Sequence, residues 1–220
     1  MAKCVVVDDT FDWQGVEKPR ISREETVLFE THVKGLSQLH PEVASNIKGR
    51  YLGLVSPEML AFYKQQNINS LQLLPIAACM HEPHLLDMGK VNYWGYNPYL
   101  FMVPDPRYAE KDVVTELKTA IRELHRNGIE VILDVVYNHT AEGGEGGTTF
   151  NLKALDSRTY IKHGCHYANF TGCGNTVDLT HQPALNLVMD TLRYWVSEFQ
   201  VDGFRFDLAA TLGREGDNYN

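Results

Sequence analysis

Two short segments combine apolar residues with side chains that could do acid–base or nucleophilic chemistry. "ILDVVYNHT" contains Asp134, Asn138 and His139, and "VDGFRFDLAA" contains Arg205 and Asp207. Carboxylates beside a cation and an imidazole can hold a nucleophile, a proton or a polar ligand. We therefore treat these five residues as candidate site residues.

The second segment carries its charges on an apolar strand pattern. Phe204, Phe206 and Leu208 alternate as in a buried strand, and Arg205 and Asp207 alternate between them on the opposite face. A charged pair inside an apolar strand is costly unless each partner is satisfied. The pair therefore predicts either a structural ion pair or, together with the acid and imidazole of the first segment, a functional site.

The elements that must position these residues alternate between strand and helix. Ser56 is a suitable N-cap for one helix and Gly128 ends another. We expect strands over 26–35, 70–76, 129–136 and 201–209, and helices over 56–67, 112–128 and 183–200. This alternation predicts right-handed crossovers and a parallel sheet.

Two long loops, 77–109 and 137–182, follow the second and third expected strands. They leave the carboxyl ends of those strands, the edge at which parallel α/β proteins bind ligands. Residues 1–25 contain no clear pattern and are expected to form an irregular lead-in to a domain over 26–220.

Composition excludes several classes of partner. The net charge is −8, which disfavours binding to phosphate backbones or anionic lipid, so we expect neither a nucleic acid nor a membrane partner. No stretch approaches the roughly 18 apolar residues of a membrane helix, and "MAKCVVVDD" is too short for a signal-peptide core. Four cysteines are too few for a disulfide scaffold, which predicts reduced thiols and a cytoplasmic location.

A histidine- and cysteine-containing loop, "HGCHYANFTGC", offers residue types that suit zinc. Its candidates are His163, Cys165, His166 and Cys173. Their spacing matches no common zinc finger, and paired CxxC elements are absent. We expect no metal here.

Motifs along most of the chain resemble one enzyme family. "DVVYNH" and "GFRFD" are similar to the first and second signature regions of the α-amylase superfamily of glycoside hydrolases. "ETHVKGLSQLHP", "NYWGYNP", "TGCGNT" and "LRYWVSEFQVDGFRFDLAATLGR" resemble the bacterial glycogen debranching enzymes, which are related to isoamylase. The similarity runs from about residue 3 to residue 216 and implies an α/β fold with the first four units of a TIM (β/α)8 barrel.

The resemblance implies a role for each catalytic candidate. Asp207 would be the nucleophile of a retaining glycosidase, and Arg205 would keep it ionised because a nearby cation favours the charged form. Asp134 would brace the site from the neighbouring strand. His139 would donate a hydrogen bond to a hydroxyl of the sugar, and Tyr96 would stack on its apolar face.

Three further residues are weaker substrate-binding candidates. Trp94 lies in the "NYWGYNP" motif, although packing is the commoner role for an aromatic residue there. Asn175 ends a loop that the resemblance sets beside the substrate groove. The residue that matches Asn138 helps to bind calcium in many members of the superfamily, but debranching enzymes often lack that ion. We therefore expect no organic cofactor and make no claim for calcium.

The resemblance also demands residues that this chain lacks. The superfamily uses a Glu after the fifth barrel strand as proton donor and a further Asp after the seventh. We therefore expect a fragment that is inactive alone and whose exposed sheet edges favour self-association or pairing with the missing half-barrel. The parent would cleave α-1,6 branch points of glycogen or branched maltooligosaccharides. An α-1,4-acting amylase, a non-catalytic carbohydrate-binding subunit and an unrelated (β/α) enzyme with convergent Asp motifs remain as alternatives.

Overall fold

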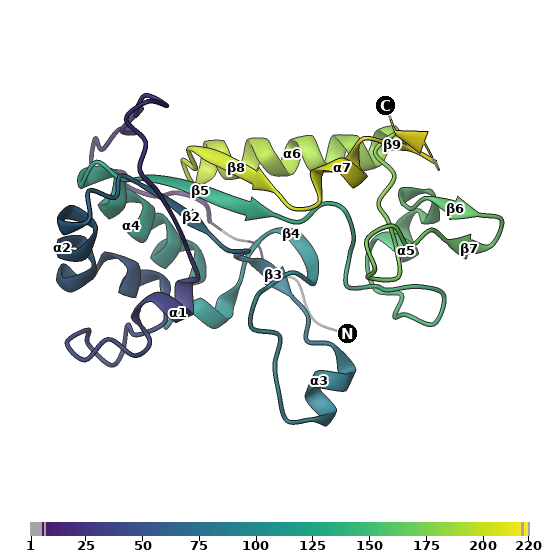
Figure 1. Cartoon of the computed structure of the whole chain (residues 1–220), viewed down its shortest axis with the longest axis horizontal. Helices are drawn as coiled ribbons and strands as arrows, with labels where there is room; N and C mark the ends of the chain where they lie inside the picture. The colour runs from purple at the N-terminus through teal and green to yellow at the C-terminus, as the bar shows by residue number, and fades with distance from the viewer. Residues whose placement is uncertain (1–5, 7, 217, 220) are drawn as a thin grey trace.

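A parallel four-stranded sheet forms the centre of the molecule (Figure 1). The computed structural model describes residues 6, 8–216 and 218–219. The strands lie side by side in chain order, namely β1 (Leu28–Thr31), β2 (Ser70–Leu73), β5 (Glu130–Val135) and β8 (Gly203–Phe206). This order confirms the predicted α/β class and is the order expected for the first four units of a (β/α)8 barrel.

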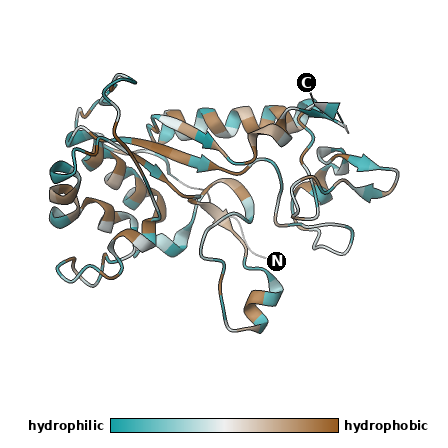
Figure 2. Cartoon of the chain, viewed as in Figure 1, coloured by the Kyte–Doolittle hydropathy of each residue, from teal (hydrophilic) through white to brown (hydrophobic). Residues whose placement is uncertain are grey.

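The strand register aligns the two charged segments. Ile132 of β5 is opposite Gly203 of β8, and two residues further along Asp134 is opposite Arg205. Figure 2 shows β2 and β5 as largely hydrophobic (brown), as expected for strands covered on both faces. The residues that could do chemistry therefore lie at the carboxyl ends of adjacent strands.

Local capping determines where two of the predicted helices begin. Helix α2 (Pro57–Gln65) starts at Ser56, whose hydroxyl accepts a hydrogen bond from the backbone amide of Met59. Helix α4 (Val113–Arg126) starts at Asp112, whose carboxylate accepts from the amides of Val114 and Thr115. Both helices lie within the ranges predicted from the sequence.

A single apolar core joins the helices to the sheet. Leu117, Ala120, Ile121 and Leu124 recur at helical spacing along α4 and are buried. The third predicted helix, α6 (Gln182–Glu198), buries Trp195, whose indole nitrogen donates to the carbonyl of Phe101. None of the helices in the described part of the chain is long and apolar enough to cross a membrane.

The first strand is shorter than predicted, because a helix begins inside the range 26–35. Strand β1 ends at Thr31 and helix α1 (Val33–Ser37) follows, so that Gly35 is helical instead of ending the strand. The Nδ1 atom of His32 accepts hydrogen bonds from the amides of Lys34 and Gly35. This cap satisfies the free amides of a helical turn and stops the strand.

The long loops contain structure that the sequence did not reveal. The range 77–109 holds an antiparallel hairpin of β3 (Ala77–Cys79) and β4 (Pro98–Pro104), helix α3 (Pro83–Asp87) and the 3-10 helix η2 (Pro106–Tyr108). Strand β4 begins and ends with a proline, and it was not predicted because proline normally argues against a strand. The remaining short elements are η1 (Tyr51–Val55), α5 (Leu152–Leu155), η3 (Ser157–Thr159), β6 (Lys162–His163), β7 (His166–Tyr167), α7 (Ala209–Leu212), β9 (Arg214–Glu215) and β10 (Asn218–Tyr219).

The expected burial of the last strand is wrong. Phe204 and Phe206 are only half-buried, and β8 ends at Phe206. Leu208 lies beyond the strand with φ of 43° and is 46% exposed. Within the described residues β8 is an edge strand of the sheet, and no further strand shields its outer side.

The described part of the N-terminal segment has no helix or strand before Leu28, and it is tied to the domain by charged side chains. The buried ammonium group of Lys118 donates to the carbonyl of Asp9 at 2.6 Å. Arg122 donates to the carbonyl of Asp12, and Lys18 donates to the carbonyl of Val201. The segment therefore packs on the domain despite its irregular backbone.

Candidate active site

A single guanidinium group joins the two carboxylates predicted from the sequence. The Nη1 atom of Arg205 lies 3.0 Å from both oxygens of Asp134 and 3.0 Å from Oδ1 of Asp207. The side chain of Asp134 is fully buried, whereas that of Arg205 is 43% exposed. The hydrogen bonds to Asp134 are the main cause of a raised pKa for Arg205, so the cation is retained.

Asp134 forms the buried end of this arrangement. The phenol of Tyr96 donates to Asp134 Oδ2 at 2.6 Å. Burial raises the pKa of Asp134 and outweighs the opposing hydrogen bonds from Tyr96 and Arg205. Burial and the bond to Asp134 likewise raise the pKa of the Tyr96 phenol, which keeps it a donor.

Asp207 lies at the surface end, directly after β8. Its amide donates to the carbonyl of Val135, which fixes its backbone against β5. The Nδ2 atom of Asn138 donates both to the carbonyl of Asp207 at 2.9 Å and to its Oδ2 at 3.0 Å. The left-handed conformation of Leu208 then turns the chain into α7. Each carboxylate oxygen of Asp207 is thus bound by a different side chain.

His139 closes the arrangement on the side of the aromatic loop. Its Nε2 lies 2.9 Å from the carbonyl of Tyr96, which can only accept and is therefore bound when Nε2 carries the proton. Its Nδ1 lies 2.6 Å from Oδ1 of Asn138. Burial lowers the pKa of His139, while the Tyr96 carbonyl and the charge of Asp207 act in the opposite direction.

These contacts form a closed ring of side chains in polar contact, in which the one proton of a neutral His139 serves either the Tyr96 carbonyl or Asn138 Oδ1. It comprises Asp207, Arg205, Asp134, Tyr96, His139 and Asn138, and it returns to Asp207. Such a network holds each member's orientation through two neighbours. The ring, which we call the carboxylate ring, brings together all three catalytic candidates and three of the substrate-binding candidates.

Two predicted substrate-binding residues lie outside the carboxylate ring. Asn175 is fully buried, where it accepts from the amide of Thr140 and donates to the carbonyls of Thr140 and Gly143. Its amide therefore ties the two ends of the long loop after β5 together. Trp94 is 58% exposed, and its ring makes edge contacts with Tyr93 and His32.

Sequence reasoning missed the residue that organises the loop after β5. Glu142 is buried, and its carboxylate accepts from the amides of Phe150, Asn151 and Lys153 and from the hydroxyl of Tyr160. Glu142 lies in the Gly-rich stretch "AEGGEGG", which is typical of a solvent-exposed loop, so no local sequence pattern indicates that it is buried.

The loop weighed as a zinc candidate does not assemble a ligand set in the part of the chain that the structure describes. No group of three or more His, Cys, Asp or Glu residues there could hold a metal ion. His166 instead lies 3.2 Å from Glu145, and Cys165 and Cys173 are exposed free thiols.

Comparison with known proteins finds relatives of similar sequence. The chain is 46% identical over 219 residues to the "Glycogen operon protein GlgX homolog" of Mycobacterium bovis, which covers 96% of this chain and 30% of that protein. It is also 46% identical over 216 residues to the glycogen debranching enzyme of Salmonella paratyphi A, with 96% and 33% covered. The chain thus spans about a third of the length of these relatives. No family model matches it.

Solved structures with a similar fold are pullulanases. The apo pullulanase of Paenibacillus barengoltzii aligns with a TM-score of 0.80 and 28% identity, covering 94% of this chain and 35% of that one. The same enzyme in complex with maltohexaose and α-cyclodextrin aligns with a TM-score of 0.78 and 28% identity, covering 91% and 33%.

Proposed function

We propose that this chain, which belongs to the α-amylase superfamily of glycoside hydrolases, carries the nucleophile side of a retaining active site that cleaves α-1,6 branch points of glycogen. The observation that carries the proposal is the carboxylate of Asp207, held between Arg205 and Asn138 at the carboxyl end of β8. Catalytic groups of (β/α) barrels lie at this end of their strands.

In the proposed reaction Asp207 attacks the anomeric carbon of the glucosyl unit at the branch. A bond forms between its carboxylate oxygen and that carbon while the glycosidic C–O bond breaks. The departing oxygen takes a proton from a carboxylic acid on the opposite side of the sugar. Water activated by the same group then hydrolyses the glycosyl-enzyme ester, and the configuration is retained.

The surrounding ring orients this nucleophile. Arg205 and Asn138 each bind one oxygen of Asp207, which leaves the remaining lone pairs to face the substrate. Asp134 acts as a positioning residue, because it anchors the guanidinium of Arg205 from a fully buried place on the neighbouring strand. This preorganisation means that little reorientation is needed as the transition state forms.

Tyr96 and His139 form the proposed sugar-binding side of the site. The ring of Tyr96 is half-buried, and its hydroxyl is bound to Asp134, so its orientation is set before substrate arrives. A fixed aromatic face suits the apolar face of a glucosyl ring. His139 is held against the Tyr96 carbonyl through Nε2, so a contact between this nitrogen and a sugar hydroxyl would replace that hydrogen bond.

The proposed substrate is glycogen or a branched maltooligosaccharide. The preference for α-1,6 linkages draws support from the printed names of the relatives, a glycogen debranching enzyme and pullulanases. A cytoplasmic location is proposed on the same ground, together with three free cysteines in the described residues.

We further propose that the chain alone turns over little substrate. A retaining mechanism needs a carboxylic acid about 5–5.5 Å from the nucleophile. Asp134 is engaged by Tyr96 and Arg205, so it is not available to protonate a leaving group. Such an acid would correspond to a residue in the part of the relatives that this chain does not cover.

The test compares nucleophile and control variants in the full-length parent and in this chain. In the parent, Asp207→Asn should abolish hydrolysis of a branched dextrin, whereas the exposed Asp190→Asn should leave it unchanged. In the chain alone, maltohexaose should bind without being hydrolysed. Full activity of the parent Asp207→Asn variant would exclude Asp207 as nucleophile. Turnover by the chain alone would overturn the proposed need for an external acid, and binding without any turnover in the parent would favour a carbohydrate-binding subunit.

A further inference from the structure

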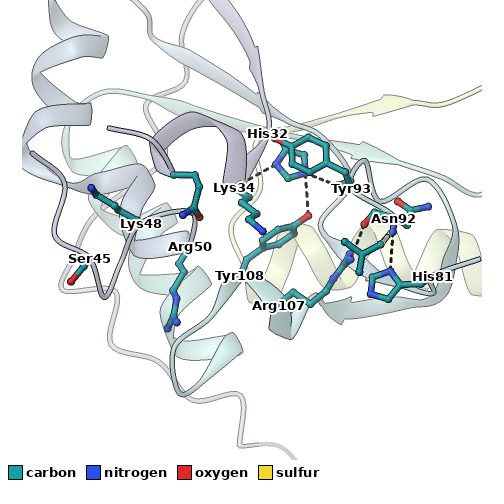
Figure 3. Close-up of a pocket in the computed structure, with 13 residues that line it drawn as sticks. His32, Lys34, Ser45, Lys48, Arg50, His81, Asn92, Tyr93, Arg107 and Tyr108 are labelled. Atoms are coloured by element: carbon teal, nitrogen blue, oxygen red, sulfur yellow. Dashed lines mark hydrogen bonds between the residues drawn. The ribbon is translucent and has the colours of Figure 1, made fainter. Parts of the chain in front are cut away.

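A second concave site lies apart from the carboxylate ring, and none of its lining residues belongs to that ring. It has a volume of about 380 Å³ and forms where four segments meet (Figure 3). These are α1 with the loop that follows it, the turn before α3 that carries His81, the loop that carries Asn92 and Tyr93, and the 3-10 helix η2. We call it the cationic pocket for the charges described next.

The pocket collects positive charge in a protein whose net charge is −8. Lys34, Lys48, Arg50 and Arg107 line it, and no Asp or Glu does so among the described residues. Arg107 is neutralised by Asp105, whose carboxylate lies 2.6 Å from its Nη2. Within the part of the chain that the structure describes, the charged groups of the other three make no ion pair or hydrogen bond.

Three unpaired cations around one hollow repel one another, which is unfavourable unless a counter-charge offsets it. All three cations are carried by α1 and the loop that follows it, so the backbone places them on the same side of the pocket. Lys34 is on α1, and Lys48 and Arg50 flank Gly49, whose φ of +66° sets the turn. A Cβ added at Gly49 would lie 2.3 Å from Gln38 Oε1 and 3.0 Å from Lys34 Cγ, so this turn packs directly under two lining side chains.

The walls of the pocket are held in place before any ligand binds. His32 accepts from two amides of α1 through Nδ1 and lies 2.7 Å from the Tyr93 carbonyl through Nε2. Its ring stacks on Tyr93 at 4.1 Å, and Tyr108 packs against its edge. Burial lowers the pKa of His32, as do the charges of Arg107 and Lys34, so the ring stays neutral and serves as a fixed link between the walls.

Neutral donors complete the lining. Nδ1 of His81 accepts from the amide of Asn92, which leaves its proton on Nε2 in the neutral ring. Gln38 and Ser45 add an amide and a hydroxyl group. A ligand that suits this lining carries a concentrated negative charge together with several hydroxyl groups.

We propose that the cationic pocket binds an organic phosphate of monosaccharide size, with Lys34, Lys48 and Arg50 around the phosphate. Lysine and arginine are the residues that bind phosphate in proteins, and each contact to a charged oxygen is strong. The pocket volume falls in the range of small-molecule sites, about 300–1,000 Å³. The pocket is therefore larger than a bare phosphate ion requires. This site is independent of glycoside hydrolysis and stands or falls on its own test.

The first experiment measures binding to the chain by isothermal titration calorimetry at low ionic strength. The probes are glucose 6-phosphate, inorganic phosphate and maltose. We expect glucose 6-phosphate to bind more tightly than inorganic phosphate, with an affinity that falls as salt is added, and maltose not to compete for the site. Equal affinity for the two phosphates would exclude recognition of the sugar moiety, and displacement of glucose 6-phosphate by maltose would exclude a phosphate site.

The second experiment removes the charges. The variant Lys48→Gln/Arg50→Gln should bind glucose 6-phosphate at least about tenfold more weakly, as should Lys34→Gln. The matched control Lys64→Gln/Lys111→Gln removes two exposed cations outside the pocket and should bind like the unmodified chain. Circular dichroism and thermal unfolding establish that each variant is folded, which we expect because these side chains have no partner to lose. Unchanged affinity in folded pocket variants, or equal losses in the control, would overturn the proposal.

Discussion

Arg205 stands opposite Asp134 in the pairing of β8 with β5, and its Nη1 lies 3.0 Å from Asp134 Oδ1. The parallel register therefore delivers a cation to a fully buried carboxylate. The same nitrogen reaches Asp207 two residues later, beyond the end of the strand. One guanidinium thus connects a structural acid with the proposed nucleophile, which explains why a charged pair is tolerated on this edge strand.

Replacing Arg205 should damage both stability and catalysis. In the chain, Arg205→Gln should lower the free energy of unfolding by about 1–2 kcal/mol, since Asp134 would lose a charged partner while Arg205 itself is partly exposed. In the full-length parent, kcat should fall on the order of 10²–10³-fold. Urea unfolding and hydrolysis of a branched dextrin measure the two effects.

The loss of stability in Arg205→Gln should depend on pH. Burial already raises the pKa of Asp134, and removing the cation should raise it further. A raised pKa means that the folded state holds its proton more tightly, so the variant loses stability as pH rises through that pKa. The gap between the two proteins should therefore narrow toward acid pH. A constant gap, or an equal loss in the exposed control Arg193→Gln, would contradict this assignment.

Asn138 is expected to act as a positioning residue for Asp207. Its amide donates to both the backbone carbonyl and the carboxylate of Asp207. In the parent, Asn138→Ala should lower kcat by about tenfold or more with little change in KM, since the nucleophile loses its orientation while the sugar contacts remain. A rise in KM at constant kcat would instead assign Asn138 to substrate binding.

Two substitutions of Tyr96 separate its ring from its hydroxyl. Tyr96→Phe keeps the aromatic face but removes the donor to Asp134, so binding of maltohexaose to the chain should change little. Tyr96→Ala should weaken that binding by about 1–2 kcal/mol if the ring stacks on sugar. Equal affinities for the alanine variant and the unmodified chain would exclude the stacking role.

The carboxylate of Glu142 should make the loop after β5 sensitive to acid. Burial opposes its ionisation, but hydrogen bonds from Tyr160 and three backbone amides prevail and lower its pKa. A lowered pKa gives stability that is present above the ordinary pKa and is lost as pH falls through the folded one. Glu142→Gln should cost about 1–3 kcal/mol near neutral pH and less in acid. Thermal unfolding across pH measures this, and Glu24→Gln, on an exposed carboxylate, is the matched control.

Lys118 should protect the N-terminal segment from proteolysis. This buried ammonium group donates to the carbonyl of Asp9 and lies over the ring of Phe199. Lys118→Met should release the segment and make it more rapidly cleaved by protease, with a loss of about 2 kcal/mol in stability. Mass spectrometry of the fragments locates the cut. Unchanged cleavage before residue 25 would show that Lys118 does not hold the segment.

Helices, their caps and the alternation of elements could be predicted from neighbouring residues. Ser56 and the apolar spacing of α4 act within a few residues of where they stand, so the sequence pattern is sufficient to recognise them. The parallel sheet follows from that alternation, because short crossovers leave few other arrangements. The predicted strand over 26–35 was too long for a related reason. Its residues favour a strand, but the His32 side chain caps a helix that begins at Val33.

The sequence by itself determined which residues could do chemistry and on which elements they lie. Only the tertiary structure decided that they form a ring, because Tyr96 meets Asp134 across 38 residues and Asn138 meets Asp207 across 69. It also buried Asn175 and Glu142 as loop anchors and brought Lys34, Lys48 and Arg50 around one hollow. The physical reason is that hydrogen bonds and charges act over a few ångströms in space, and the distance between two side chains is a property of the folded chain.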